Sequence, residues 1–162
     1  MDSARISTPL GVAEIRGDAE GIVSISISDG KGETDAAVPP HLRAACEQIR
    51  DYFDGTRREF NFPMRPEGTD FQQRVWDELL KIPFGRTVSY LELSRRLGDP
   101  KAIRAVAAAN GRNPIWLAIP CHRVIGSDGS LVGYAGGIHR KKWLLNHESP
   151  APQASLFGSN SD

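Results

Sequence analysis

Apolar and polar residues alternate in the first part of the chain, and the pattern then changes to a helical repeat. Val23, Ile25 and Ile27 alternate with serines, which predicts a half-buried strand, and another strand is expected at residues 12–16. After a Pro-Pro pair, the apolar residues recur at the spacing of one helix face. They are Leu42, Ala45, Cys46, Ile49, Tyr52 and Phe53. This order of elements predicts a small α/β domain with Cys46 in its core.

Two prolines and a glycine within residues 62–68 interrupt this pattern, and we interpret residues 63–68 as a linker. The linker separates an N-terminal domain, residues 1–62, from a C-terminal domain, residues 69–149. The remaining residues, 150–162, are mostly polar and are expected to form a disordered tail.

The C-terminal domain opens with helical patterns that carry start and stop signals. Thr69 and Ser89 each begin a capping-box sequence, the first before an amphipathic helix and the second before a short one. Gly98 is suited to end the short helix, and an alanine-rich helix capped by Asp99 is expected over residues 101–110. Two short helices joined by a glycine-bearing turn are typical of the DNA-binding helix-turn-helix, although an ordinary helical hairpin has the same pattern.

Turn signals organise the last part of this domain. Asn113 precedes a proline, which favours an Asx-type turn, so Asn113 is expected to hold the loop that leads to Cys121. Residues 126–129 have the composition of a hairpin turn. The last helix is expected over residues 138–148 and ends before Pro150.

The residues best suited to covalent chemistry are Cys121 and His122, which are adjacent and flanked by apolar residues. A cysteine attacks as the thiolate, and a nearby base is needed to form thiolate at neutral pH. Neighbouring side chains of an extended segment point to opposite faces, so a bound water is expected to relay the proton unless the chain turns here. An imidazole base also needs an acceptor on its other nitrogen, and Glu148 is the candidate. An inert buried cysteine is the alternative.

Composition and charge limit the remaining possibilities. The 162 residues have a net charge of zero, but residues 1–68 hold 8 Lys+Arg and 12 Asp+Glu, whereas residues 69–149 hold 12 and 7. This asymmetry indicates a nucleic-acid partner for the C-terminal half, with scattered solvated charges as the alternative. Two cysteines form neither a disulfide framework nor a four-thiolate zinc site. Without a membrane-length apolar run or a secretory signal, a cytoplasmic protein with no membrane partner is expected.

Seven stretches of the C-terminal half strongly resemble the O6-alkylguanine-DNA alkyltransferases, also called methylated-DNA–protein-cysteine methyltransferases. The stretches are residues 68–76, 82–90, 105–106, 113–114, 119–125, 133–137 and 142–148. The Pro-Cys-His-Arg-Val string at residues 120–124 is highly specific. The resemblance implies an α+β fold, with a small ribonuclease H-like α/β domain followed by a mostly helical domain that contains a winged helix-turn-helix-like motif. It also implies single-turnover DNA repair without a cofactor or a metal.

The resemblance implies a role for each residue of the reactive centre. Cys121 would accept the alkyl group of O6-alkylguanine, His122 would take its proton through water, and Glu148 would hold His122. Tyr90 would donate a proton or hydrogen bond to N3 of the departing guanine. Asn113 would hold the turn before the active-site segment.

The resemblance also implies how DNA is bound. The damaged base would be flipped out of the duplex, and Arg104, on a helix in the minor groove, would fill the vacated stack. The other implied DNA contacts are Thr69, Lys101, Ala105, Ala108, Arg112 and Arg123. The implied guanine pocket contains Trp116, Val124, Tyr134, Ala135 and Gly136. Ala135 stands where several members have a serine that hydrogen-bonds O6. Either a backbone N–H replaces that donor, or guanine recognition is weaker or more permissive. The implied partner is double-stranded DNA containing O6-alkylguanine, bound by a monomer, with O4-alkylthymine raised as a second substrate.

Two other functions fit parts of the pattern. A lesion-binding protein without chemistry would keep the DNA-binding residues, but alkyltransferase-like proteins usually have tryptophan at the position of Cys121. An unrelated Cys-His hydrolase would turn over repeatedly and would need neither the helix-turn-helix nor Arg104. Modification of the thiol by an alkylated base would separate alkyl transfer from hydrolysis.

Overall fold

A three-stranded antiparallel sheet is the framework of the first of two structural units. The computed structural model describes residues 1–30, 34–35 and 37–150, and its first unit comprises Met1–Gly68 and Pro114–Ala118. The strands are β1 (Asp2–Thr8), β2 (Gly11–Asp18) and β3 (Gly21–Ser28), paired in the order β1-β2-β3. Ile25 and Ile27 are buried while Ser26 and Ser28 are exposed, which confirms the predicted alternation over this part of β3, whereas Val23 and Ser24 are both half-buried. Strand β1 was not predicted, because Ala4 and Ile6 are its only buried residues.

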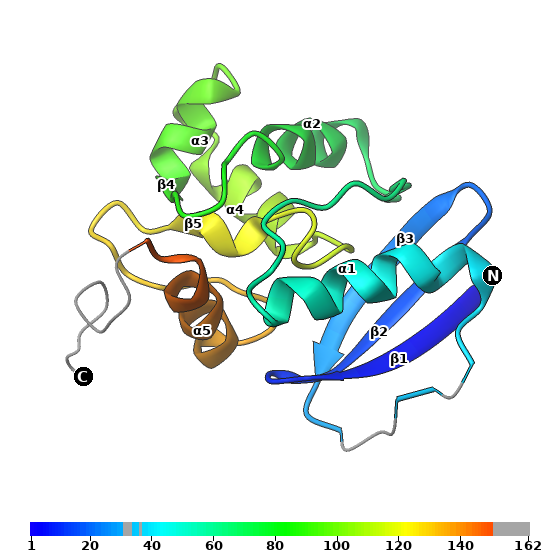
Figure 1. Cartoon of the computed structure of the whole chain (residues 1–162). Coiled ribbons are helices and arrows are strands. Elements are labelled where there is room, and N and C mark those ends of the chain that lie inside the picture. The colour runs from blue at the N-terminus through cyan, green and yellow to red at the C-terminus, as the bar shows by residue number, and fades with distance from the viewer. Residues whose placement is uncertain (31–33, 36, 151–162) are drawn as a thin grey trace. The chain divides into compact units, whose positions relative to one another are not determined.

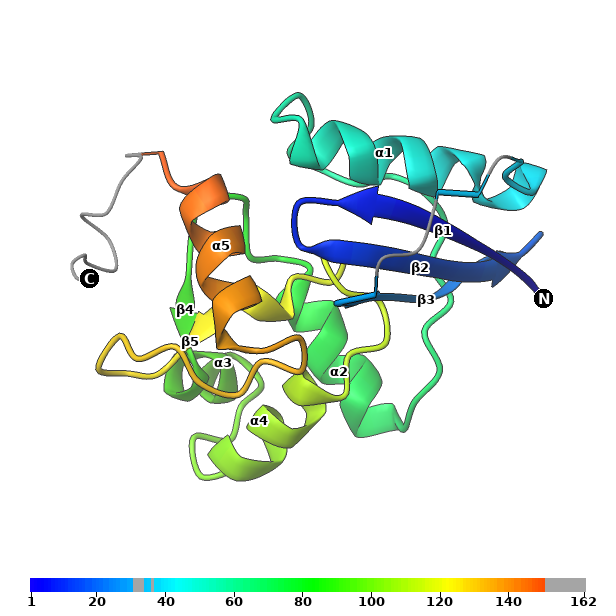
Figure 2. The same ribbon diagram turned by 90° about the horizontal axis from the view of Figure 1, so that it is seen from below.

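Helix α1 (Arg43–Phe53) covers one face of this sheet, as the two views in Figures 1 and 2 show, and it follows the short 3-10 turn η1 (Pro40–Leu42). The predicted apolar stripe is confirmed by burial. The buried members are Leu42, Ala45, Cys46, Ile49 and Tyr52. Phe53 is only half-buried and packs edge-on against Tyr52, with ring centroids 5.3 Å apart. Cys46 is therefore a core residue, as predicted.

Two segments extend the sheet unit beyond its three strands. The Ile22 N–H donates to the Pro63 carbonyl at 2.9 Å, and the Ile25 N–H donates to the Pro114 carbonyl at the same distance. Prolines are tolerated beside a strand where only their carbonyls are needed, because they lack an N–H. The segment interpreted as a linker thus contacts β3. Pro114–Ala118, which was predicted to be part of the C-terminal domain, belongs to the first unit.

The second unit, Thr69–Asn113 with Ile119–Asp162, begins with helix α2 (Asp70–Leu79). Thr69 caps it with the predicted capping box: its side chain accepts from the Gln72 N–H, and the Gln72 side chain accepts from the Thr69 N–H. Val75, Trp76 and Leu79 are buried along one face. The indole N–H of Trp76 donates to the Ala109 carbonyl at 2.9 Å, which links α2 to the alanine-rich helix.

The two short helices are α3 (Tyr90–Arg96) and α4 (Ile103–Gly111). Ser89 caps α3 by accepting from the Glu92 N–H, and Gly98 adopts a left-handed φ of +90° in the turn that follows. Helix α4 begins two residues later than predicted. Asp99 accepts from the Lys101 N–H and stabilises the preceding turn, so it does not cap the helix. The predicted pair of helices joined by a glycine-bearing turn is otherwise present.

The remaining elements bring the chain back beside α3. Strand β5 (Val124–Ile125) pairs in parallel with β4 (Val88–Ser89), and η2 (Cys121–Arg123) directly precedes β5. The predicted turn at residues 126–129 is present, but the residues after it form no strand, so the turn does not join the two strands of a hairpin. Helix α5 (Ile138–Glu148) has the predicted bounds. The expected disordered tail lies outside the described residues, apart from Pro150.

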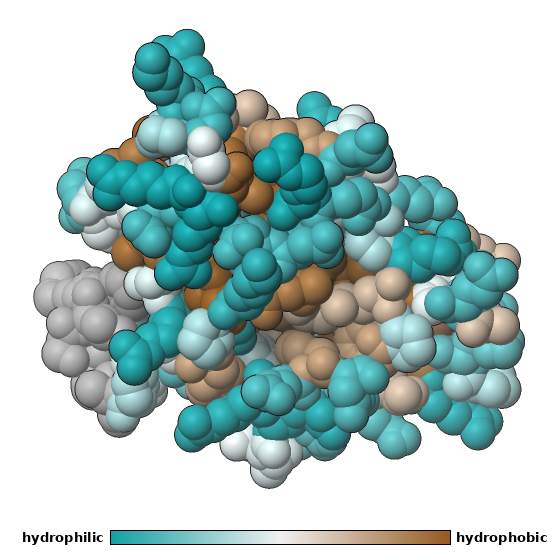
Figure 3. Space-filling view, turned by 90° about the horizontal axis from the view of Figure 1, so that it is seen from above, coloured by the Kyte–Doolittle hydropathy of each residue, from teal (hydrophilic) through white to brown (hydrophobic). Residues whose placement is uncertain are grey.

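The chain is thus an α+β protein with one small antiparallel sheet and a group of helices. On the face shown in Figure 3, hydrophilic side chains project outward and hydrophobic residues lie in patches between them. Among the described residues, no helix combines the length and apolarity needed to cross a bilayer.

Candidate active site

Cys121 is held in a single turn of 3-10 helix and is 2% exposed. The side-chain amide of Asn113 donates to the Ile119 carbonyl at 2.7 Å and to the Cys121 sulfur at 3.1 Å. The amide of Asn110, near the end of α4, donates to the Cys121 carbonyl at 3.4 Å. Two asparagines therefore fix the backbone and the sulfur, and Asn113 lies where the sequence predicted a residue that holds this loop.

The Cys121 thiol is protonated at neutral pH. Burial raises the pKa of this thiol to about 11, against smaller lowering effects of the Asn113 hydrogen bond and the Lys141 charge. A buried anion loses hydration, which is why its protonated form is favoured. Nucleophilic chemistry at this sulfur consequently requires a base that removes the proton.

His122 and Glu148 form a buried pair that is suited to provide this base. The imidazole Nε2 lies 2.8 Å from the Glu148 carboxylate, and both side chains are at most 2% exposed. The imidazole Nδ1 is buried and accepts no hydrogen bond from any described residue. With Nε2–H donating to Glu148, Nδ1 carries the lone pair and is the nitrogen able to take a proton. The chain turns at His122 in a 3-10 turn, which was the alternative to an extended segment.

Arg123 completes this network and corrects a prediction. Its guanidinium donates to both oxygens of Glu148, at 2.7 and 3.0 Å, and to the Ile82 carbonyl at 2.7 Å. It was expected to contact DNA, but it is 6% exposed and lies 5.8 Å from the Phe84 ring centroid. Adjacent residues of a 3-10 turn diverge, and here the turn directs Arg123 inward toward a buried carboxylate.

Glu148 stays ionised because two basic side chains surround it. Burial alone raises the pKa of this carboxyl, but the hydrogen bond from His122, together with the Arg123 guanidinium, holds the pKa well below the usual range of a glutamate. A carboxylate that remains charged keeps Nε2 of His122 protonated and so preserves the tautomer with a free Nδ1.

Tyr90 presents a hydroxyl donor from the first turn of α3. Its O–H donates to the Val132 carbonyl at 3.1 Å. Burial raises the pKa of Tyr90 and outweighs the lowering effect of a hydrogen bond with Asn110, so the phenol remains a donor. Gly133 has a φ of +74°, and a Cβ there would lie 3.0 Å from the Tyr90 hydroxyl. Only glycine therefore fits beside this hydroxyl without strain.

Lys141 is a buried residue of this centre that was not predicted from the sequence. Its ammonium donates to the carbonyls of Val124 and Val132 and lies 5.7 Å from the Tyr90 ring centroid. Burial lowers the pKa of Lys141 to about 8, against the opposing effect of Cys121. Lysine on a surface helix is usually solvated, but Lys141 precedes Glu148 by seven residues and so shares its helix face. That spacing was the signal that could have found it.

The other predicted site residues are the exposed DNA-contact candidates, the guanine-pocket candidates of the second unit, and Trp116 of the first unit. The DNA-contact candidates that are solvent-exposed are Thr69, Lys101, Arg104, Ala105, Ala108 and Arg112. Of the guanine-pocket candidates, Val124, Tyr134 and Gly136 are buried in the second unit and Ala135 is exposed there. Trp116 belongs to the first unit and is half-buried, so its place in the guanine pocket stays a prediction. Within residues 1–30, 34–35 and 37–150, no three His, Cys, Asp or Glu side chains are grouped to hold a metal ion.

Comparisons with known proteins agree with this site. Residues 70–150 match the family described as 6-O-methylguanine DNA methyltransferase, DNA binding domain. The chain is 41% identical to the methylated-DNA–protein-cysteine methyltransferase of Methanosarcina acetivorans, over 91% of this chain and 98% of that one. It is 50% identical to the protein of the same name from Mycobacterium tuberculosis, over 73% and 72% of the two chains.

Solved structures resemble the whole chain as well. The structure of Mycobacterium tuberculosis OGT in complex with DNA has a TM-score of 0.81 and 42% identity, covering 95% of this chain and 98% of that one. An O6-methylguanine DNA methyltransferase from Methanococcus jannaschii has a TM-score of 0.66 and 26% identity, covering 96% and 98%. A buried cysteine with a His-Glu pair, inside the residues that match a DNA-binding domain, defines a class of DNA-directed, cysteine-dependent transferases. The chain belongs to the methylated-DNA–protein-cysteine methyltransferase family.

Proposed function

We propose that the protein repairs DNA by direct reversal, moving a methyl or other alkyl group from O6-alkylguanine to Cys121 in one irreversible step. The observation that carries this proposal is the hydrogen-bonded set Asn113–Cys121 and His122–Glu148, buried in a chain of this family. The same residues keep the thiol unreactive until a substrate is bound, because the sulfur is protonated and accepts a hydrogen bond from the Asn113 amide.

The proposed reaction is a displacement at the alkyl carbon. The Cys121 thiol loses its proton through a water to Nδ1 of His122, the S–C bond forms, and the C–O6 bond breaks. Guanine leaves with the electron pair of that bond, and the Tyr90 hydroxyl donates to N3 as negative charge develops there. Charge stabilisation by a positioned donor is among the largest contributions to such reactions.

The product explains a single turnover without a cofactor. The S-alkylcysteine is a thioether, which has no leaving-group chemistry to restore the thiol, so each copy acts once. One copy of the chain carries every residue that the reaction uses, and we therefore propose a monomer acting on double-stranded DNA. A reducing compartment such as the cytoplasm would keep Cys121 available as a free thiol.

We propose that DNA binds at the exposed surface of α3 and α4, and we assign these two helices to a winged helix-turn-helix. We assign the first unit to the ribonuclease H-like fold. An O6 atom cannot be reached inside a stacked duplex, so the guanine must be flipped out. Small, exposed Ala105 and Ala108 allow α4 to approach a minor groove, and exposed Arg104 would occupy the gap. Val124, Tyr134 and the backbone at Ala135 would then contact the flipped guanine.

The proposal is tested on the DNA. A duplex with one O6-methylguanine is incubated with limiting protein, and its nucleosides are quantified. Restored guanine should rise to one mole per mole of protein and then stop. Guanine in excess of the protein would indicate a hydrolase that turns over, and unchanged O6-methylguanine with the duplex still bound would indicate a lesion-binding protein.

Replacing Arg104 with alanine should slow transfer from duplex DNA far more than transfer from a free O6-alkylguanine base. Without a side chain to fill the stack, the flipped state loses stabilisation of a few kcal/mol, which corresponds to roughly a hundredfold in rate. The free base has no stack to leave and should react within about twofold of wild type. Single-turnover rates on both substrates provide the comparison.

Arg95→Ala is the matched control, since Arg95 is an exposed arginine on the neighbouring helix α3. It removes the same charge, so its effect measures general phosphate attraction. Equal losses on both substrates in the Arg104 variant, or equal duplex losses in the two variants, would remove Arg104 from base flipping.

A further inference from the structure

Asn110 is a buried residue at the end of α4, the helix whose exposed side carries Arg104. It is 1% exposed, because it lies one turn after buried Val106 on the inner face of the helix. Its amide nitrogen donates to the Cys121 carbonyl at 3.4 Å, and its backbone carbonyl accepts from the Asn113 N–H at 3.3 Å. Asn110 therefore joins the helix that we propose to bind DNA to the turn that holds the reactive sulfur.

The oxygen of this side-chain amide has no partner. Oδ1 of Asn110 is buried and accepts no hydrogen bond from any described residue. A buried carbonyl oxygen without a donor costs stability, and a leucine of similar shape would fill the same space without that penalty. Turning the amide over gives no relief, because Oδ1 would then face the Cys121 carbonyl and two acceptors would meet. An asparagine at this position is therefore explained by its N–H donors and not by packing.

One of these donors faces Tyr90. The amide nitrogen has two N–H groups, and the Cys121 carbonyl needs only one of them. Helix α3, whose first residue is Tyr90, packs against α4, and a hydrogen bond with the Asn110 side chain lowers the pKa of Tyr90. A hydrogen bond has this effect when it stabilises the charged form, which for a phenol means that a donor faces the oxygen. The amide thus connects the turn of the nucleophile with the oxygen of the proton donor.

This contact leaves the proton of Tyr90 free to move. A phenol oxygen can accept and donate at once, so it accepts from Asn110 while its O–H donates to the Val132 carbonyl at 3.1 Å. In the proposed reaction the O–H turns from that carbonyl to N3 of guanine. Its proton moves toward N3 as the electron pair of the C–O6 bond passes to the base, and negative charge builds on the phenol oxygen. A donor that already faces this oxygen stabilises the charge without having to move.

We propose that Asn110 is a positioning residue for alkyl transfer: its amide holds the Tyr90 oxygen beside the Cys121 turn and stabilises the charge that this oxygen acquires as guanine departs. This role rests on the proposed function. It differs from the role of Asn113, whose amide donates to the sulfur and so acts on the nucleophile. Asn110 acts on the departure of the base, so experiments can separate the two roles.

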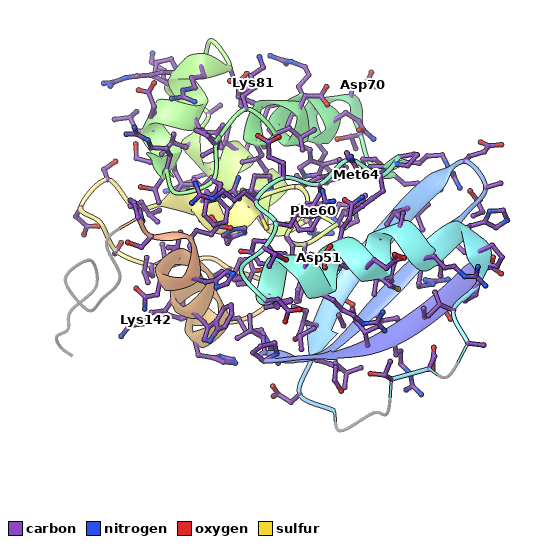
Figure 4. The ribbon with its side chains drawn as sticks, in the orientation of Figure 1. Asp51, Phe60, Met64, Asp70, Lys81 and Lys142 are labelled. Atoms are coloured by element: carbon purple, nitrogen blue, oxygen red, sulfur yellow. The ribbon has the colours of Figure 1, made fainter. Side chains whose placement is uncertain are left out.

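The test compares Asn110→Leu with Gln48→Leu. Gln48 also has a buried side-chain amide, but it lies in α1, the helix on which Figure 4 labels Asp51. With a saturating O6-methylguanine duplex, Asn110→Leu should transfer the methyl group roughly 10- to 100-fold more slowly than wild type, the effect of losing one hydrogen bond to a charged group. Gln48→Leu should transfer at the wild-type rate. Similar rates for the two variants would overturn the inference.

A substrate without N3 shows whether Asn110 acts through Tyr90. In 3-deaza-O6-methylguanine a C–H group replaces N3, so the Tyr90 hydroxyl has no acceptor at that position of the base. Wild type and Asn110→Leu should therefore react with a duplex containing this base at rates within about threefold of each other. If the substitution slows transfer from the 3-deaza substrate as much as transfer from O6-methylguanine, Asn110 only supports the fold of the site and the inference fails.

Iodoacetamide reports the nucleophile alone, because iodide leaves without receiving a proton. Asn110→Leu should be alkylated at Cys121 within about twofold of the wild-type rate, since Asn113 still donates to the sulfur. Peptide mapping would distinguish this product from alkylation of Cys46. A rate that falls as far as the rate of methyl transfer would assign the effect to Cys121 and contradict the role at Tyr90.

If Asn110→Leu fails to fold, Asn110→Ala decides, because it removes the same two donors, adds no volume and favours a helix. It should show the same loss on O6-methylguanine and the same insensitivity with the other two reagents, and a wild-type rate of methyl transfer would overturn the inference. The proposed function is judged by wild type. If wild type restores no guanine, the function fails and the inference with it, whereas normal transfer by wild type and by the Asn110 variants overturns the inference alone.

Discussion

Replacing Cys121 with serine is expected to abolish alkyl transfer while leaving the affinity for lesion-containing DNA within about threefold of wild type. A serine hydroxyl is a far weaker nucleophile than a thiolate, and loss of a catalytic nucleophile costs at least about 10⁴-fold in rate. Serine is close in size to cysteine and can accept the hydrogen bond that Asn113 donates to the sulfur. The exposed residues of α4 are untouched, so binding is expected to persist.

Cys46→Ala supplies the matched control, because Cys46 is the other of the two cysteines and is equally buried, but in α1. It should transfer the alkyl group at the wild-type rate, with a modest loss of stability from the cavity it leaves. Transfer would be measured with a labelled O6-methylguanine duplex, and binding with the same duplex by fluorescence anisotropy. Residual stoichiometric transfer in Cys121→Ser would overturn the assignment of the acceptor.

The Glu148→Gln substitution is expected to slow transfer by roughly 10² to 10⁴-fold, the range that general-base catalysis contributes. Glutamine preserves the shape of the side chain but removes the charge that faces His122 at 2.8 Å and Arg123 at 2.7 Å. Without that charge the imidazolium that forms on proton uptake is less stable, and the tautomer with a free Nδ1 is no longer enforced. Single-turnover transfer rates check this expectation, and a rate within twofold of wild type would contradict it.

The same substitution should change how stability depends on pH. The pKa of Glu148 in the folded state is depressed, so the unfolded state binds its proton first as pH falls. The contribution of ionised Glu148 to the free energy of unfolding is complete above the pKa of an unfolded glutamate, about 4.3. Below that pH, the contribution is lost at up to roughly 1.4 kcal/mol per pH unit. Glu148→Gln should lack this loss. At neutral pH it should be less stable by about 3 kcal/mol, because Arg123 is left buried without its counter-charge.

Glu92→Gln is the control for that measurement, since Glu92 pairs with Arg96 at 3.2 Å on the surface of α3. An exposed ion pair of this kind contributes little to stability. The unfolding free energy of Glu92→Gln should therefore match that of wild type within about 0.5 kcal/mol across the pH range. Urea unfolding between pH 3 and 7 compares the three proteins. Parallel profiles for wild type and Glu148→Gln would show that the buried network does not carry the acid sensitivity.

The sequence predicted the elements whose signals are local. The capping box at Thr69, the N-cap at Ser89, the alternation in β3 and the stripe of α1 each depend on residues close together in the chain, and all are present, although at Ser89 the structure shows only the serine's half of the predicted capping box. Strand β1 was missed because it contains only two buried apolar residues, so its assignment depends on pairing with β2. Pairing between two segments has no signal in either segment alone. The joining of Pro114 to β3 was missed for the same reason.

At the site, the proximity of Glu148 to His122 was anticipated because the chemistry of an imidazole base requires an acceptor. Arg123 was misassigned as a DNA contact that the family resemblance implied, because its burial beside Glu148 has no signal in the sequence. Lys141 was overlooked because one lysine in a run of basic residues looks solvated. The direction in which a charged side chain points depends on how its helix packs, and a sequence does not state that directly.

The most direct test of the account is the intact mass of the protein after incubation with an oligonucleotide containing O6-methylguanine, followed by peptide mapping. The account predicts a gain of one methyl group in place of one hydrogen, once per chain, in the peptide that contains Cys121. A protein of unchanged mass that still binds the lesion, or a methyl group on any other residue, would contradict it.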